Sequence, residues 1–567
     1  MSESPFRSAS SLGWPARLLL AACAFLIFFA GLGTIPLLEP DEGRYAEIPR
    51  EMLAGGDFVT PHLNGVLYFE KPPLYYWLNA GAMAVLGRTE LACRLAGACL
   101  GLAGLGLAWA LGRSMDAGSG RGTGLLAAVL LGTAPLYVAL ARANIIDMTL
   151  AFFLGATLTC FWLAQEREKG ERGERLLWYG LFACAALATL TKGLIGFVIP
   201  GAVIFFYLLL TRRWRLLLRV PWLGGIALFL VIAAPWHVLA ARRNPEFLWF
   251  YFVHEHLLRY TTPEAMREAP FWYFVPVLLL GLLPWSGLLP AAATLFRRGW
   301  LRERPELVFL AVWASFVFLF FSASHSKLIP YVLPACLPLA VLFALTLERA
   351  ATEAGRTRAW ARGGILVGAV VLVALALPFL WAALGRVPQY SPEVSPVLLA
   401  FALATLLAAL AAAILGWRTG LDRRGVAALA FAAALFIGCI WAVGPRVGRY
   451  RSSREIAGML HARLRPGDEV YSFRCYPQSL PFYLDREIGV VHFRTELGWG
   501  IDHLPPAERV RRFPRAAEFR ERWSSSQTFY LVLEKDDLDS LKTFGLAPGP
   551  ILLEQDKLLL MTNRPVG

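Results

Sequence analysis

Apolar stretches of about eighteen or more residues recur along this chain, and each is long enough to cross a hydrocarbon layer of roughly 30 Å as an α-helix. Of the 567 residues, 57% are hydrophobic and only 17% are charged, whereas soluble domains carry about 25% charged residues. A soluble core could not bury so much apolar surface. The sequence therefore predicts an all-α polytopic membrane protein.

The apolar pattern divides into thirteen expected spans. They are centred on residues 17–38, 92–111, 123–141, 145–164, 176–191, 193–211, 222–240, 271–291, 305–322, 328–347, 363–384, 397–416 and 424–442. The first span is long and lacks a clear small-residue cleavage site before Pro36. We therefore interpret it as a membrane anchor and not as a cleaved signal peptide.

Arginine-rich loops set the expected orientation. The loops after spans four, six, eight, ten and twelve read QEREKGERGER, TRRWRLLLR, RRGWLRER, ERAATEAGRTRAWAR and WRTGLDRR. Such loops stay in the cytoplasm, so we expect a cytoplasmic N-terminus and an exterior C-terminal tail. The net charge of +14 then has a topological origin, and it gives no reason to expect nucleic-acid binding.

The sequence predicts two domains. Residues 1–443 form a transmembrane domain, whose exterior loops 39–91 and 242–270 mix aromatic and charged residues in a way that suits helices in the membrane interface. From about Gly444 the pattern changes: a capping box SSRE opens a helix, and strand-like runs follow at VYSF, IGVVHF, TFYLVLE and ILLE. Residues 444–567 should therefore form a soluble α/β domain.

On this topology the unusual charged and polar residues all map to the exterior side. They are Asp41, Glu42, Glu70, Lys71, Asp147, Lys192, His254, Glu255, His256, Arg259 and Lys327. Charges near hydrocarbon are costly and often mark a functional path. For any single residue the alternative is that loops are polar anyway. That alternative weakens for Asp147 and Lys192, because their loops are very short and otherwise small or apolar.

The stretch LLEPDEGRYAEIPREMLAGGD predicts an exterior helix that begins near Pro40 and stops at two glycines. On this helix Asp41, Arg44 and Tyr45 share a face, because they are three and four residues apart. A carboxylate beside an arginine can align or deprotonate an acceptor, or stabilise positive charge on a sugar ring. It can equally be a carboxylate held by the helix dipole, and the acid alone does not decide.

Two further motifs supply candidate ligands. In YFEKPPLYYW two prolines fix an extended turn after Lys71, and Lys71, Lys192 and Arg259 are candidate cations for a lipid phosphate, unless they snorkel to headgroups. In FVHEHLLRY the two histidines are two residues apart and point to different faces. One histidine with Glu70 could still bind a divalent metal ion.

These residues also carry a family resemblance. PDEGRYAEIPREML followed by HLNGVLYFEKPPLYYW resembles the first exterior loop of the bacterial lipid A aminoarabinose transferases, which are related to the protein O-mannosyltransferases in the GT-C class. The agreement continues through NIIDM, LTKG, HEHLLRY, SKLIPYVLP and YPQSLPFYLDR. It covers nearly the whole chain.

The resemblance implies a GT-C fold with about thirteen spans, in the bacterial inner membrane, with a periplasmic C-terminal domain. It implies a monomer that moves a sugar, 4-amino-4-deoxy-L-arabinose, from undecaprenyl phosphate to a lipid A phosphate. By matching motif positions, Asp41 and Asp147 would be the catalytic acids, with Glu70 and His254 as a metal pair. The same matching assigns the carrier-phosphate pocket to Arg44, Tyr45, Tyr68, Lys71, Lys192, Arg259 and Tyr331.

Four points stay open at this stage. No residue is identified that would recognise the amine of an aminosugar, and no cofactor is certain. A protein O-mannosyltransferase, which has a protein acceptor, is the nearest alternative within the enzyme class. A flippase for lipid-linked sugars is the alternative from another class, but it needs charges near the bilayer midplane and access from both sides.

Overall fold

A computed structural model describes residues 13–116, 122–258, 269–297, 299–386, 395–418 and 422–564. Arg259 therefore lies outside the described residues, as does the side chain of His256. The chain forms two compact units. We call residues 1–31 and 95–443 the helical unit, and residues 32–94 and 444–567 the mixed unit.

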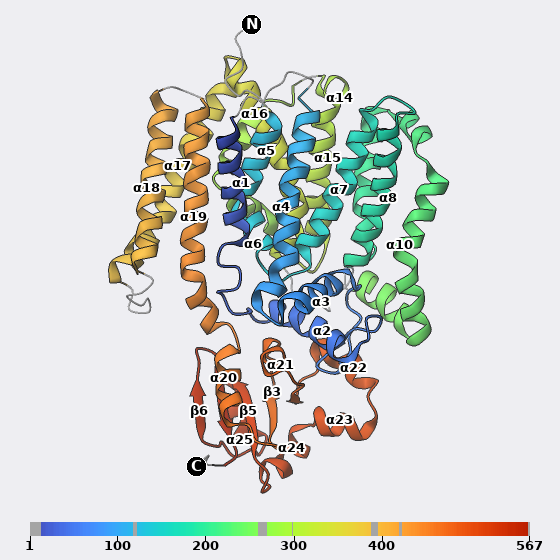
Figure 1. Cartoon of the computed structure of the whole chain (residues 1–567), viewed down its shortest axis with the longest axis vertical. Helices are drawn as coiled ribbons and strands as arrows, with labels where there is room; N and C mark the ends of the chain where they lie inside the picture. The colour runs from blue at the N-terminus through green and yellow to red at the C-terminus, as the bar shows by residue number, and fades with distance from the viewer. Residues whose placement is uncertain are drawn as a thin grey trace. The chain divides into compact units, whose positions relative to one another are not determined.

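The helical unit consists of helices and short 3-10 or π-helical segments, labelled η (Figure 1). In chain order these are α1 (Trp14–Phe29), α4 (Glu90–Ser114, which begins in the mixed unit), α5 (Thr123–Gly132), α6 (Pro135–Ala141), α7 (Asp147–Gln165), α8 (Arg172–Lys192), α9 (Ile195–Thr211), η2 (Trp214–Arg219), α10 (Trp222–Arg243), η3 (Trp249–Leu258), η5 (Phe271–Tyr273), α12 (Phe274–Gly281), η6 (Trp285–Leu288), α13 (Leu289–Ala293), α14 (Trp300–Glu303), α15 (Pro305–Ala323), η7 (Ile329–Ala335), α16 (Cys336–Thr352), α17 (Arg356–Trp381), η8 (Ala382–Arg386), α18 (Ser395–Arg418) and α19 (Arg423–Tyr450, which ends in the mixed unit).

The polytopic fold class is confirmed. Within the described residues, eight helices are long and apolar enough to cross a membrane, and ten spans result if two bent pairs count as one span each. The bent pairs are α5 with α6, at 67°, and η5–α12 with η6–α13, at 106°. Twelve of the predicted spans fall on helices or on such pairs. The first, 17–38, overlaps α1 only as far as Phe29, where that helix ends. The number thirteen itself stays a prediction.

The interior of the helical unit is aromatic where α7, α8, α9 and α15 meet. The ring of Phe161 lies 5.9 Å from those of Trp178 and Phe309 and 5.8 Å from that of Tyr207. Such ring pairs add to the burial of large apolar surface. They fix α7 against α8, and these two helices run side by side in Figure 1.

Arg142 secures the end of the first helix. Its Nη1 and Nη2 donate hydrogen bonds to the carbonyl oxygens of Ile27, at 2.7 Å, and Ala30, at 2.5 Å. The guanidinium also lies 4.2 Å from the ring centroid of Trp441. The last carbonyl groups of a helix have no hydrogen-bond donor within the helix. Arg142 supplies donors to two such carbonyls where α1 ends.

The mixed unit combines an exterior segment near the N-terminus with the C-terminal tail. Its elements are α2 (Asp41–Gly55), β1 (His62–Leu63), β2 (Val66–Leu67), α3 (Leu74–Leu86), α20 (Arg454–Arg463), β3 (Glu469–Phe473), α21 (Ser479–Leu484), β4 (Gly489–Val491), η9 (Thr495–Leu497), α22 (Gly498–Asp502), α23 (Pro506–Arg512), α24 (Ala516–Trp523), β5 (Phe529–Glu534), η10 (Lys535–Asp537), α25 (Leu538–Thr543), β6 (Ile551–Glu554) and β7 (Leu558–Thr562). The predicted helix after Pro40 is α2, and Gly56 ends it in a left-handed conformation.

A five-stranded sheet forms the centre of the tail, in the order β4-β3-β5-β7-β6. β3 runs parallel to β4 and β5, and β7 pairs antiparallel with β5 and β6. The four predicted strand-like runs are β3, β4, β5 and β6, so the α/β domain is confirmed. Sequence analysis missed β7. Its alternate residues Leu559 and Met561 pack in the cluster that contains Phe519 of α24.

The predicted capping box was wrong, although its helix exists. α20 begins at Arg454, but its N-cap residue Ser453 makes no capping hydrogen bond. The Ser453 hydroxyl instead donates to Oε1 of Glu39 at 2.9 Å. Ser452, the first residue of the predicted box, accepts a hydrogen bond from the backbone nitrogen of Arg454 at 3.3 Å.

Within the mixed unit, α2 packs directly on α21. A Cβ atom at Gly43 would lie 2.3 Å from the backbone nitrogen of Ser479, which no other residue type tolerates without a shift. Asn64 adds a second junction, because its side chain donates to the carbonyl of Ile488 and accepts from the Ile488 amide, both at 2.9 Å. Residues 32–94 thus share a compact unit with the tail. The functional division into 1–443 and 444–567 stays a prediction.

Candidate active site

In the helical unit, Asp147 and Lys192 form an ion pair. Asp147 is the first residue of α7 and Lys192 the last of α8, and successive antiparallel helices place those ends together. Nζ of Lys192 lies 2.5 Å from Oδ1 of Asp147, and the side chains are only 10% and 13% exposed. The pair is therefore largely desolvated, which strengthens the attraction between the charges.

Tyr331 completes this group. Nζ of Lys192 lies 4.7 Å from the centroid of the Tyr331 ring, within cation–π range. That ring packs against Phe321 at 5.0 Å. Lys327, another predicted exterior charge, is buried and donates to the Ser324 carbonyl at 2.6 Å. The structure thus brings three predicted site residues, Asp147, Lys192 and Tyr331, into one cluster.

In the mixed unit, Arg44 is the centre of a second group. It is buried on α2, and its Nη1 lies 3.7 Å from Oδ1 of Asp41, whose side chain is 50% exposed. Nε donates to Oε1 of Gln478 at 2.8 Å, and Nη2 lies 3.7 Å from Glu496. Each of the three guanidinium nitrogens of Arg44 thus faces a polar side chain, which fixes the orientation of the guanidinium. The half-exposed carboxylate of Asp41 lies beside this cation.

Sequence analysis missed Gln478 and Glu496. Gln478 lies in the YPQSLPFYLDR motif, but a glutamine in a soluble domain is ordinary, and nothing in the sequence links it to Arg44. The amide nitrogen of Gln478 donates to Glu496, so the two residues act on Arg44 as a connected pair. The available signal was the motif match itself.

Glu39 fixes the backbone that presents Gln478. Its carboxylate accepts hydrogen bonds from the backbone nitrogens of Gln478, at 2.8 Å, and Ser479, at 2.9 Å. Burial raises the pKa of Glu39, and the hydrogen bonds from Ser479, Ser453 and Gln478 oppose that shift. A carboxylate from the exterior segment therefore positions the start of α21.

Two of the aromatic residues predicted for the pocket, Tyr45 and Tyr68, are buried in the mixed unit. Tyr68 is fully buried, and burial raises its pKa well above the usual value, while the Arg44 charge opposes the shift. The ring of Tyr45 meets that of Tyr75 edge-on at 5.5 Å and stacks on that of Tyr76 at 6.2 Å. Nζ of Lys71 donates to the carbonyl of Glu70 at 2.7 Å.

A separate acidic cluster lies farther along α2. Arg50 binds Glu47 through two hydrogen bonds, of 2.7 and 2.6 Å, and contacts Asp485 at 3.2 Å. Burial raises the pKa of Glu51 well above its usual value, and neighbouring Glu47, which shares a hydrogen bond with it, adds to the shift. The ion pairs of Arg50 thus connect this part of α2, the helix that carries Asp41, to Asp485 of the tail.

The metal prediction receives no geometric support. No group of three or more His, Cys, Asp or Glu side chains suited to a metal ion occurs in the described ranges. Glu70 belongs to the mixed unit and His254 to the helical unit, where Nδ1 of His254 lies 3.4 Å from Glu255. The pairing of Glu70 with His254 stays a prediction.

Two family models match the chain. Residues 16–251 match the family described as dolichyl-phosphate-mannose-protein mannosyltransferase. Residues 456–562 match the aminoarabinose transferase C-terminal domain. The two matches cover separate parts of the sequence, and residues 252–455 lie between them.

Curated relatives are similar over much of the chain. The undecaprenyl phosphate-alpha-4-amino-4-deoxy-L-arabinose arabinosyl transferase of Aeromonas hydrophila is 36% identical over 62% of this chain and 64% of the relative. That alignment thus spans less than two thirds of the Aeromonas protein. The Erwinia tasmaniensis protein of the same description is also 36% identical, over 65% of this chain and 67% of its own length.

A solved structure extends the similarity to the whole chain. The crystal structure of ArnT from Cupriavidus metallidurans bound to undecaprenyl phosphate is 30% identical, covers 98% of this chain and 99% of that one, and superposes with a TM-score of 0.83. The chain belongs to the aminoarabinose transferase family. This family is part of the GT-C class of glycosyltransferases. An archaeal oligosaccharyltransferase from Archaeoglobus fulgidus, with 14% identity and a TM-score of 0.51, shares the fold only.

Proposed function

We propose that this family member transfers 4-amino-4-deoxy-L-arabinose from undecaprenyl phosphate to a phosphate of lipid A at the periplasmic face of the inner membrane. The observation that carries the proposal is the full-length match to an ArnT bound to undecaprenyl phosphate. The aminoarabinose named in the Aeromonas and Erwinia relatives supports the choice of sugar. The desolvated cations of the two clusters support the choice of a phosphate-bearing donor.

In the proposed reaction the bond between the sugar C1 and the carrier phosphate oxygen breaks, and undecaprenyl phosphate leaves with the electron pair. An oxygen of the acceptor phosphate forms the new bond to C1. A phosphate monoester has a second pKa of about 6, so the acceptor needs little deprotonation near neutral pH. Asp41, exposed beside Arg44, would then mainly position the acceptor and stabilise positive charge on the sugar ring.

The cations would hold the carrier phosphate. Arg44 is already oriented by Gln478 and by Glu496, so little side-chain freedom is lost when it binds an anion. Lys71, and Arg259 from the second exterior loop, are the further proposed phosphate ligands. Each N–H to phosphate contact would be a charge-assisted hydrogen bond, stronger than a neutral one.

Asp147 acts through Lys192 in this proposal. The 2.5 Å pair keeps Lys192 charged in a site with little water, where an isolated ammonium would be costly. The Tyr331 ring limits the directions in which Nζ can point. The ammonium group of Lys192 is therefore already desolvated and oriented before a carrier phosphate binds.

The test of the proposed function is mass spectrometry of lipid A from cells with and without this protein, in a host that supplies the donor lipid. We expect an aminoarabinose mass increment on a lipid A phosphate. Unmodified lipid A, with normal amounts of protein in the membrane, would contradict the proposal. Lys71→Ala should weaken the apparent affinity for the carrier lipid in a purified assay.

A protein O-mannosyltransferase is the second candidate, because residues 16–251 match that family model. It predicts transfer of a hexose to serine or threonine of a protein, and mass spectrometry of membrane and secreted proteins would detect it. The match of residues 456–562 to the aminoarabinose transferase C-terminal domain favours the first candidate.

A further inference from the structure

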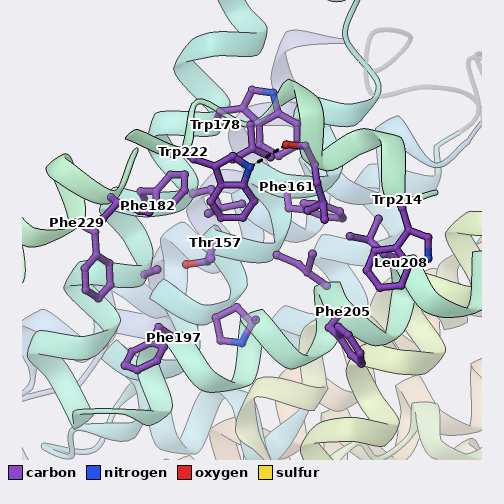
Figure 2. Close-up of a pocket in the computed structure, with 18 residues that line it drawn as sticks. Thr157, Phe161, Trp178, Phe182, Phe197, Phe205, Leu208, Trp214, Trp222 and Phe229 are labelled. Atoms are coloured by element: carbon purple, nitrogen blue, oxygen red, sulfur yellow. Dashed lines mark hydrogen bonds between the residues drawn. The ribbon is translucent and has the colours of Figure 1, made fainter. Parts of the chain in front are cut away.

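An apolar cavity of about 420 Å³ lies within the helical unit, between α7, α8, α9, η2 and α10. Figure 2 shows aromatic rings around it, with Trp178 and Trp222 at one end and Phe197 and Phe229 at the other. The volume is within the range of roughly 300–1,000 Å³ typical of ligand sites. The cavity is therefore large enough to hold part of a ligand.

The cavity is distinct from the candidate active site. Asp147 begins α7 and Lys192 ends α8, whereas the cavity lies toward the other ends of these helices, where Phe161 and Trp178 line it. The proposed reaction uses none of its lining residues. The cavity consequently needs an explanation of its own.

Its occupant must be apolar. Thr157 carries the one lining hydroxyl, and that hydroxyl already donates to the carbonyl of Phe153 at 2.8 Å. The indole nitrogens of Trp178 and Trp222 also have acceptors, in Glu174 at 3.1 Å and in the Leu217 carbonyl at 2.9 Å. A buried water molecule requires two to four polar partners, which this lining does not offer. If the cavity were empty, its lining atoms would lose van der Waals contacts.

The open side of the cavity faces away from the helix bundle. Its floor residues Phe161 and Trp178 are buried, whereas Phe205, Trp222 and Phe197 are exposed. α9 and α10 both pack on α8, and the rings of Phe197 and Phe229 meet at 6.1 Å. Because these exposed lining residues lie on α9 and α10, the open side of the cavity would face hydrocarbon in a membrane-spanning unit.

Positive charge marks one end of the opening. Arg212, just before η2, and Arg215, within η2, are both exposed. Arg219 has a different role, because its Nε binds Glu174 at 2.8 Å and its Nη atoms contact backbone carbonyls at the end of α7. Arg219 thus holds η2 across the end of the cavity. Arginines at a membrane surface attract anionic headgroups.

We propose that this cavity binds one acyl chain of an anionic phospholipid, whose phosphate lies at Arg212 and Arg215. The apolar floor accounts for the chain, and the two arginines at the η2 end account for the headgroup charge. The site is a lipid site separate from carrier-lipid binding, and it holds α9, η2 and α10 together around the chain.

Gly201 permits a clean test. It lines the cavity, and a Cβ atom at this position would meet no atom within 4 Å, so Gly201→Leu fills the cavity without displacing backbone. Gly106 on α4 also has open space around its Cβ position, and Gly106→Leu is the matched control. The full-length protein is purified in mild detergent, exchanged into nanodiscs of equal phosphatidylglycerol and phosphatidylethanolamine, and released for native mass spectrometry.

We expect the wild-type protein and Gly106→Leu to retain one phosphatidylglycerol. The fraction of Gly201→Leu that retains this lipid should be at least ten-fold lower. The double variant Arg212→Gln/Arg215→Gln should keep one lipid but lose the preference for phosphatidylglycerol by several-fold. Equal retention by Gly201→Leu would overturn the proposal. So would an unchanged headgroup preference in the double variant, or the carrier lipid as the retained species in protein from cells.

Discussion

Nε of Arg44 donates a hydrogen bond to Oε1 of Gln478 at 2.8 Å, although 434 residues separate the two in the chain. The same glutamine donates its amide to Glu496, which also faces the Arg44 guanidinium at 3.7 Å. The direction of a candidate phosphate-binding cation is thus set by side chains of the C-terminal tail. The tail therefore positions this side chain.

Gln478→Ala should raise the KM for the carrier-linked donor about ten-fold, since loss of one hydrogen bond to a charged group costs about 1.5 kcal/mol or more. kcat should change less, because Asp41, the proposed catalytic carboxylate, is retained. The measurement is steady-state kinetics with purified protein in detergent or nanodiscs.

The exchange variant Gln478→Glu/Glu496→Gln keeps one amide and one carboxylate beside Arg44 and should restore the KM to within about three-fold. Gln555→Ala, which removes a half-buried tail glutamine that donates to the Arg449 carbonyl at 3.2 Å, is the control. If the exchange variant had a KM as high as that of Gln478→Ala, the side-chain amide of Gln478 would not act through Arg44.

Removal of one partner of the Asp147–Lys192 pair should destabilise the helical unit. Lys192→Met leaves a carboxylate that is 13% exposed without its cation, which costs about 3 kcal/mol for a buried pair. Asp147→Asn/Lys192→Met should cost less than Lys192→Met alone. Thermal unfolding of each variant gives the comparison. Arg349→Met, at an exposed pair with Glu353, should cost under about 1 kcal/mol.

Asp41→Asn should abolish transfer and leave expression and folding nearly intact. The side chain is half exposed and its contact with Arg44 is long, at 3.7 Å, so its loss disturbs little packing. Asp539→Asn, at a surface carboxylate that is 95% exposed, is the matched control. Near-normal turnover by Asp41→Asn in the lipid A assay would remove Asp41 from the catalytic role.

Glu51→Gln should make the mixed unit less sensitive to pH. Burial and neighbouring Glu47 raise the pKa of Glu51 in the folded protein, so the folded state holds a proton that the unfolded state releases. Stability is then full below the unfolded pKa of about 4.3 and falls as pH rises toward the folded pKa. An uncharged glutamine avoids this loss. The free energy of unfolding of Glu51→Gln, relative to that of the wild type, should therefore be about 1 kcal/mol more favourable at pH 8 than at pH 5. Identical pH profiles of melting temperature would contradict it.

Local patterns predicted most of the secondary structure. Apolar runs located the helices of the helical unit, and alternating apolar residues located four of the five tail strands. The helix α2 was predicted from acids in its first turn and two closing glycines, and it ends at Gly55 as expected. These features depend on neighbours within a few residues, so one sequence suffices to recognise them.

Long-range partners could not be predicted in this way. Asp147 and Lys192 stood out because charge is costly in short apolar loops, and a helical hairpin brings such loops together. Gln478 is polar in a polar domain and carries no such cost, so its place beside Arg44 was not foreseeable. The same holds for Ser453, whose hydroxyl binds Glu39 instead of capping its own helix.

The mixed unit is assembled from two segments of the chain, residues 32–94 and 444–567. During synthesis at roughly 5–20 residues per second, the first segment emerges tens of seconds before the second. Until then α2 lacks the Ser479 backbone against which Gly43 packs, and Arg44 lacks Gln478. A chain that stalls or is truncated before the tail is complete therefore cannot present an ordered guanidinium, so the role proposed for Arg44 requires the finished polypeptide.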